Sequence, residues 1–146
     1  MGNRAVIEMR GQETGIYLHW NGGRHFVEPV LEVAREYGIS GRAWDYGAAR
    51  LSQIFANFFG GVLSVGVGPV RNMDRDNGDN GVYILDEELN IIDRLYTRGP
   101  EQQVYDPETV KREVKLINDP VFLNDPFEWF HAANNAMSND KVRSHA

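Results

Sequence analysis

The sequence predicts an α+β fold, with a single mostly antiparallel sheet of about five strands packed against helices. Short β-branched segments bounded by glycine alternate with longer segments whose apolar residues recur at helical spacing. Of the 146 residues, 42% are hydrophobic, which is typical of one globular domain rather than a disordered chain. The expected order of elements is β-β-α-α-β-β-β-α-α.

Two strands come first and are expected to pair as a hairpin. Residues 4–10 and 15–21 are rich in apolar side chains, and the polar turn between them has a glycine at each end. In the second strand Ile16, Leu18 and Trp20 alternate onto one face, which predicts that they point into the core. The opposite face of this strand gathers the polar and aromatic side chains of Tyr17, His19 and Asn21.

Two helices are expected next. Residues 24–37 place apolar side chains at helical spacing. Proline is best tolerated in a first turn, so Pro29 predicts that the regular helix begins near Val27. The second helix is expected to be capped by either Ser40 or Asp45 and to end at the Gly-Gly pair that follows two phenylalanines.

Three further strands are expected after these helices. Residues 62–67 are β-branched and bounded by glycines, which predicts a strand in the centre of the sheet. The loop 72–81 contains two Asn-Gly pairs, a strong hairpin signal, and residues 82–85 and 91–96 follow as strands. Strands three, four and five are therefore expected to form an antiparallel meander.

The sequence becomes helical towards its C-terminus. Asp106 and Pro107 supply a cap and a first-turn proline, and Pro120 is expected to end this helix. Asp125 repeats the start signal for a last helix. The helix before it has one modest apolar stripe, formed by Val110, Val114 and Ile117. We expect three parts, namely a compact core over 1–98, a helical extension over 99–133 packed on or beside it, and a polar tail over 134–146.

Composition excludes several kinds of chemistry. The chain has no cysteine, which excludes disulfides, thiolate metal sites and cysteine nucleophiles, and fits a reducing cytoplasm. The net charge is −6, and the 15 basic residues are scattered among 21 acidic ones, so direct nucleic-acid binding is not expected. No apolar run approaches the roughly 20 residues of a membrane helix, and we expect neither membrane association nor a secretory signal.

The acidic loop is the sharpest chemical candidate. Asp74, Asp76 and Asp79 supply three carboxylates within six residues, and hard cations prefer oxygen ligands. Counted from Asp76, an EF-hand-like frame lacks its third-position ligand, because Gly78 stands there. A solvated hairpin loop whose Asp, Asn and Gly residues serve turn geometry is the favoured interpretation. These aspartates are therefore weak metal candidates, and no cofactor is expected.

A catalytic interpretation would use His19 as general base with carboxylates of this loop, as in a metal-dependent hydrolase or nuclease. A structural histidine is commoner. The sequence contains no phosphate-cradling GKS or GKT loop, no G-x-S-x-G elbow and no H-E-x-x-H helix. These absences favour a non-enzymatic protein, and the hydrolase is the alternative.

The C-terminal aromatic residues suggest a contact with another chain. Trp129 and Phe130 are adjacent, so on a helix they cannot share the centre of one face. One of them is therefore a candidate for a partner contact, since aromatic residues are enriched at interfaces. The alternative is that both flank a broad buried face. A symmetric homo-oligomer that uses these residues is a third hypothesis.

Three motifs together, at residues 15–23, 57–61 and 76–83, resemble a family of small hypothetical proteins of phages, prophages and mobile elements. The resemblance covers roughly residues 4–97. Because this family has no established activity, it transfers no functional residue. It implies a phage accessory protein in the bacterial cytoplasm, an antagonist of host defence that binds a host protein or sequesters a nucleotide signal.

The expected contact surface combines three parts of the chain. They are the polar face of the second strand, the turn formed by Gly22, Gly23 and Arg24, and the acidic loop over residues 74–80, which includes Asp76 and Asp79. If the ligand carries a phosphate, the Gly-Gly turn leading into a helix offers free backbone amides, and Arg24 is the charge partner.

Overall fold

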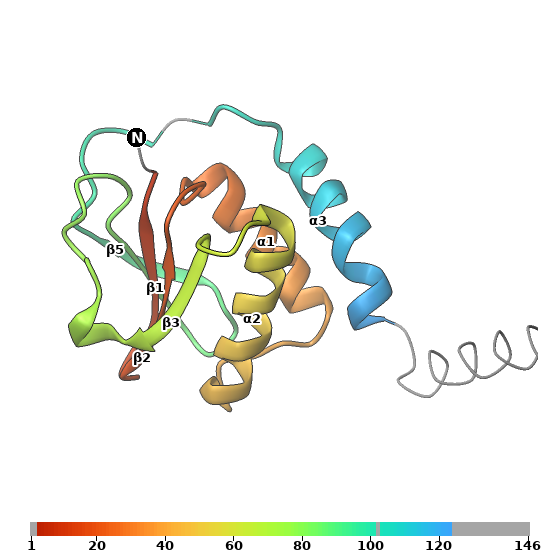
Figure 1. Cartoon of the computed structure of the whole chain (residues 1–146), viewed down its shortest axis with the longest axis horizontal. Coiled ribbons are helices and arrows are strands. Elements are labelled where there is room, and N and C mark those ends of the chain that lie inside the picture. Colours follow the sequence, from red (N-terminus) through yellow and green to blue (C-terminus); the bar gives the residue numbers. More distant parts are fainter. Residues whose placement is uncertain (1–2, 102, 124–146) are drawn as a thin grey trace, which may run out of the picture.

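The computed structural model describes residues 3–101 and 103–123, which form one five-stranded sheet with three helices (Figure 1). The strands are β1 (Ala5–Met9), β2 (Thr14–Leu18), β3 (Val65–Pro69), β4 (Val82–Leu85) and β5 (Ile91–Leu95). The helices are α1 (Arg24–Glu36), α2 (Trp44–Phe59) and α3 (Pro107–Phe122), with a short 3-10 helix η1 (Val70–Asn72) after β3. The predicted α+β class is confirmed, and the last expected helix lies outside the described residues.

The sheet has the strand order β3-β2-β1-β4-β5. The hairpin of β1 and β2 forms as expected, and β1 pairs with β4 in parallel, while the other neighbours are antiparallel. The predicted meander is correct for β4 and β5, which pair antiparallel, but wrong for β3, which pairs with β2. Strand β3 was expected in the centre of the sheet and lies instead at its edge. The chain from η1 to β4 crosses the sheet to reach the far side of β1 instead of turning back as a hairpin.

Helices α1 and α2 cover one face of the sheet (Figure 1). The core between this face and the helices contains the apolar side chains of alternate β1 residues, including Ile7, and those of Ile16 and Leu18 of β2. Trp20 was expected there but is only half-buried, because it lies beyond the end of β2. Glu8 points to the opposite face and is also buried, where it receives two hydrogen bonds from Arg75 of the crossing loop at 2.6 and 3.2 Å.

The helix boundaries differ from the expected ones where tertiary contacts outweigh local signals. Helix α1 begins at Arg24, so Pro29 lies in its second turn, where the missing amide removes only one backbone hydrogen bond. Neither Ser40 nor Asp45 caps α2. The helix starts at Trp44, whose indole Nε1 donates to the carbonyl of Thr14 at 2.7 Å.

Helix α3 packs against α1 and α2. It continues through Pro120, because its last turn is held by Phe122, which stacks on Tyr37 with 4.9 Å between ring centroids. Asn118, rather than the expected Ile117, completes the buried stripe and accepts a hydrogen bond from Asn57 at 2.9 Å. No helix within the described ranges is long and apolar enough to cross a membrane.

Candidate functional site

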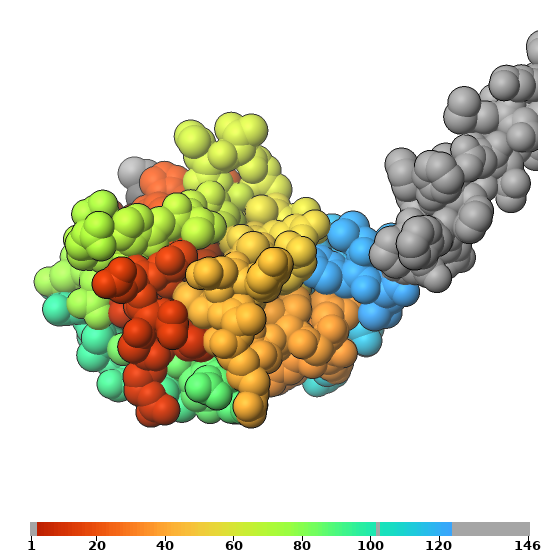
Figure 2. Space-filling model, turned by 90° about the horizontal axis from the view of Figure 1, so that it is seen from below, coloured from red at the N-terminus to blue at the C-terminus, as the bar shows by residue number. Residues whose placement is uncertain are grey.

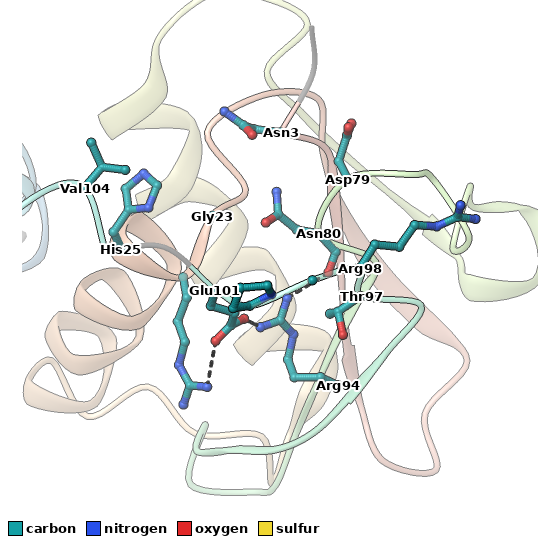
Figure 3. A pocket seen from close by; sticks show the side chains of 13 residues that line it. Asn3, Gly23, His25, Asp79, Asn80, Arg94, Thr97, Arg98, Glu101 and Val104 are labelled. Carbon is teal, nitrogen blue, oxygen red and sulfur yellow. Dashed lines mark hydrogen bonds and ion pairs between the residues drawn. The ribbon is translucent and has the colours of Figure 1, made fainter.

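A cavity of about 270 Å³ opens at the start of α1 (Figure 3). Four segments that are distant in the sequence surround it. They are Asn3 ahead of β1, the start of α1, the end of the crossing loop, and β5 with the chain that follows it. The polar side chains that line it are those of Asn3, Arg24, His25, Asp79, Asn80, Arg94, Thr97, Arg98 and Glu101.

Arg94 lines the cavity and packs against the ring of Tyr83. The ring of Tyr83 is fully buried, and its hydroxyl donates to the carbonyl of Gly22 at 2.7 Å. The guanidinium carbon of Arg94 lies 3.7 Å from the centroid of that ring, a cation–π contact, and the Arg94 side chain is only 13% exposed. Burial lowers the pKa of Arg94 but leaves a permanent cation, because an arginine cannot be deprotonated in a protein.

The start of α1 lines the cavity with Gly23, Arg24 and His25. Gly23 is the N-cap and supplies no side chain to cap the helix. The amides of Phe26 and Val27 donate to the Gly23 carbonyl, so those of Arg24 and His25 have no partner within the helix. The helix dipole adds a partial positive charge at this end. The helix start is therefore an electropositive edge of the cavity.

Three residues that line the cavity carry buried polar atoms without a hydrogen-bond partner within the described chain. They are Nδ1 of His25, Nδ2 of Asn80 and Nε of Arg94. Each such atom costs free energy, of the order of 1–3 kcal/mol when a buried group is left unsatisfied. Figure 3 shows these side chains around one space, although they come from α1, the crossing loop and β5. A ligand rich in acceptor atoms would satisfy them.

Both carboxylates that line the cavity are held by arginines. Asp79 accepts hydrogen bonds from Nε and the backbone amide of Arg4 at 2.8 and 3.1 Å. Burial acts to raise the pKa of Asp79, but these contacts with Arg4 outweigh it and keep the pKa below its ordinary value. Glu101 lies between Arg24, 3.1 Å away, and Arg94, with which it also forms an ion pair.

The other aspartates of the acidic loop are also paired with arginines. Asp74 lies 3.2 Å from Arg4, and Asp76 lies 3.3 Å from Arg98. Among the residues that the structure describes, no group of three or more His, Cys, Asp or Glu side chains could hold a metal ion. The loop is closed instead by the buried side chain of Asn77, whose Oδ1 accepts from the amides of Asp79 and Gly81.

The structure brings together only some of the predicted site residues. Gly23, Arg24 and Asp79 line the cavity, and the carbonyl of buried Gly22 accepts a hydrogen bond from Tyr83. On β2 and just beyond it, a hydrogen bond of 2.9 Å joins the hydroxyl of Tyr17 to Nδ1 of His19, and neither side chain lines the cavity. Asn21 is likewise not among the lining residues, and Trp129 and Phe130 lie outside the described residues.

The sequence analysis missed several polar residues that line the cavity, namely Asn3, Arg94, Thr97, Arg98 and Glu101. No sequence signal distinguishes Arg94, which follows Asp93 in β5. Only the strand register places it opposite Tyr83, on the sheet face that the helices cover.

No family model matches this chain, and comparison with curated proteins and with solved structures found no match. The resemblance to small phage and prophage proteins therefore stays a prediction.

Proposed function

We propose that this protein is a non-enzymatic binding protein of the phage accessory type. In this proposal the cavity at the start of α1 holds a phosphate-bearing small molecule, and sequestration of a nucleotide signal is how the protein inhibits a host defence system. Arg24, Arg94 and the free amides of α1 bind the phosphate group. Phosphate is favoured because arginines and helix N-termini are its usual partners in proteins.

The observation that carries this proposal is the set of buried unpartnered polar atoms on His25, Asn80 and Arg94 around one cavity. Polar atoms are buried without partners only rarely, and a functional site is one of the recognised reasons. A binding role is favoured over catalysis, because both carboxylates among the lining residues are engaged by arginines. Neither is free to act as a general acid or base.

Isothermal titration calorimetry with inorganic phosphate, 5′-nucleotides and cyclic nucleotides tests the proposal. Arg24→Ala is expected to weaken binding about tenfold or more, the contribution of one hydrogen bond to a charged group. Arg24 is half exposed, so the fold should persist. The control is Arg42→Ala, which removes an exposed arginine paired with Glu88 and outside the cavity. Equal weakening by both variants would contradict a specific site.

If no compound in the panel binds, the small-molecule form of the proposal is wrong and a host protein is the target. One surface would then be favoured. The turn between α2 and β3 projects from the molecule (Figure 2), and its Val62 and Leu63 are 95% and 72% exposed. Exposed apolar groups beside the edge strand β3 are typical of a protein contact.

A further inference from the structure

We infer that Glu101 is an internal competitor for the anion site, and that the site therefore selects phosphate groups with two negative charges. Phosphomonoesters would be bound, and singly charged phosphodiesters and carboxylates would be disfavoured. The inference rests on the proposed function and specifies the ligand class of the same cavity.

The carboxylate of Glu101 occupies the position that a bound anion would take. Its Oε2 lies 3.1 Å from Nη1 of Arg24, and its Oε1 forms an ion pair with Arg94. The carboxylate thus bridges two guanidinium groups, one from α1 and one from β5 (Figure 3). Nε of Arg24 is taken by Glu28 at 3.0 Å, which leaves Nη1 for the cavity.

Glu101 is an incomplete partner for this site. With Glu101 in place, Nε of Arg94, Nδ2 of Asn80 and Nδ1 of His25 still have no hydrogen-bond partner among the described residues. A carboxylate has two oxygens in one plane, whereas a phosphomonoester presents three acceptor oxygens. A phosphate can therefore bridge the two arginines and accept from Asn80 at the same time.

The charge balance leads to the preference for a dianion. Among the charged residues that line the cavity, Asp79 is paired with Arg4 and Arg98 with Asp76, which leaves Arg24, Arg94 and Glu101. Glu28 also pairs with Arg24 but does not line the cavity. A singly charged ligand that displaces Glu101 replaces one negative charge with another, so its electrostatic attraction to the two arginines gives little net binding energy. A dianion matches both guanidinium groups. The electrostatic attraction of the second negative charge is strongest at Arg94, because this side chain is mostly removed from water.

The test compares adenosine 5′-monophosphate with adenosine 3′,5′-cyclic monophosphate by calorimetry, on the wild type and on Glu101→Gln. The two probes share base and sugar and differ in phosphate charge. We expect the wild type to prefer the monoester, and this preference to fall as the pH drops through the second phosphate pKa, near 6. Glu101→Gln should tighten cyclic-nucleotide binding about fivefold, which corresponds to the free energy of one half-exposed ion pair. The ratio between the affinities for the monoester and for the cyclic nucleotide should therefore become smaller.

Two further variants make the result decisive. Glu87→Gln removes an equal charge from an exposed residue outside the cavity and should change neither affinity. Glu101→Asp keeps the charge on a shorter side chain and should bind the cyclic nucleotide with an affinity between those of the wild type and Glu101→Gln. This variant replaces Glu101→Gln in the test if Glu101→Gln does not fold. Nucleotide binding that is unchanged or weaker in both Glu101 variants would overturn the inference and leave the proposed function intact. Absence of binding by every variant, inorganic phosphate included, would overturn both.

Discussion

Replacement of Asn77 by alanine tests whether one buried side chain holds the loop that brings Asn80 to the cavity. Asn77 is 4% exposed, and its amide group makes four hydrogen bonds within the loop. Oδ1 accepts from the amides of Asp79 and Gly81, both at 3.0 Å, and Nδ2 donates to the carbonyls of Asp74 and Gly81 at 3.1 and 3.2 Å. The side chain therefore uses its full hydrogen-bonding capacity.

The expected loss of stability follows from these contacts. Each hydrogen bond contributes about 1 kcal/mol, and water that enters the loop restores part of that, so we expect Asn77→Ala to lower the free energy of unfolding by about 3 kcal/mol. This is a large part of the roughly 5–15 kcal/mol that stabilises a typical domain. With a urea m-value of about 2 kcal/mol/M, the unfolding midpoint should fall by about 1.5 M, measured by tryptophan fluorescence.

The control is Asn72→Ala, which removes an exposed amide near the start of the same crossing segment and should change the midpoint little. A second measurement is nucleotide affinity, which should fall for Asn77→Ala because Asn80 is no longer held in place. A loss of less than about 1 kcal/mol in the free energy of unfolding would be close to that of an ordinary surface substitution. It would mean that other contacts hold the loop, and it would refute the reasoning.

Two further predictions concern acid stability and assembly. Because the folded pKa of Asp79 is below its unfolded value, its contribution is present above about pH 3.9 and is lost as the pH falls through the folded pKa. Thermal melts of Asp79→Asn should therefore decline less steeply in acid than those of the wild type. The oligomer hypothesis for Trp129 and Phe130 predicts that a chain ending at Leu123 folds, since α3 is complete, but forms a smaller species in light scattering. An unchanged assembly state would remove both aromatic residues from consideration.

The turn between β1 and β2 and the helix α2 could be predicted from local sequence patterns. The turn between β1 and β2 contains Gly11, which has a φ of +80°, and polar residues that do not compete for the core. The apolar spacing of α2 likewise matches its buried residues, Leu51, Ile54 and Phe55 among them. These elements could be predicted because neighbours within a few residues determine the backbone conformation.

The pairing of β4 could not be predicted, because the same residues support two different loops. The two Asn-Gly pairs in residues 72–81 are a hairpin signal when Asn and Gly occupy the turn positions. In the structure Asn77 uses its side chain to bridge Asp74 and Gly81, and the loop closes on itself. The amide of Val6 then donates to the Gly81 carbonyl at 2.9 Å, so β4 enters the sheet parallel to β1.

The cavity was only partly predictable, since the place of Arg94 depends on the exact register between β4 and β5. The Gly-Gly turn and Arg24 could be read from the sequence, because a glycine turn before a helix is a local pattern. Arg94 could not, because a charged residue in a short strand normally faces water. Only the register that places it opposite Tyr83 turns its guanidinium onto a buried ring.

The Gly22–Gly23 turn connects the fold to the proposed site. A Cβ at Gly22 would lie 2.5 Å from the Asn3 carbonyl oxygen, so only glycine fits where this turn passes β1. The amide and carbonyl of Gly22 are held by Asn3 and Tyr83, and this fixes the turn against the sheet. The helix then starts without a side-chain cap, beside a buried arginine and an unpartnered asparagine. An uncapped helix start, a buried guanidinium and an unpartnered amide thus meet at one place, and this coincidence is what supports the proposed ligand site.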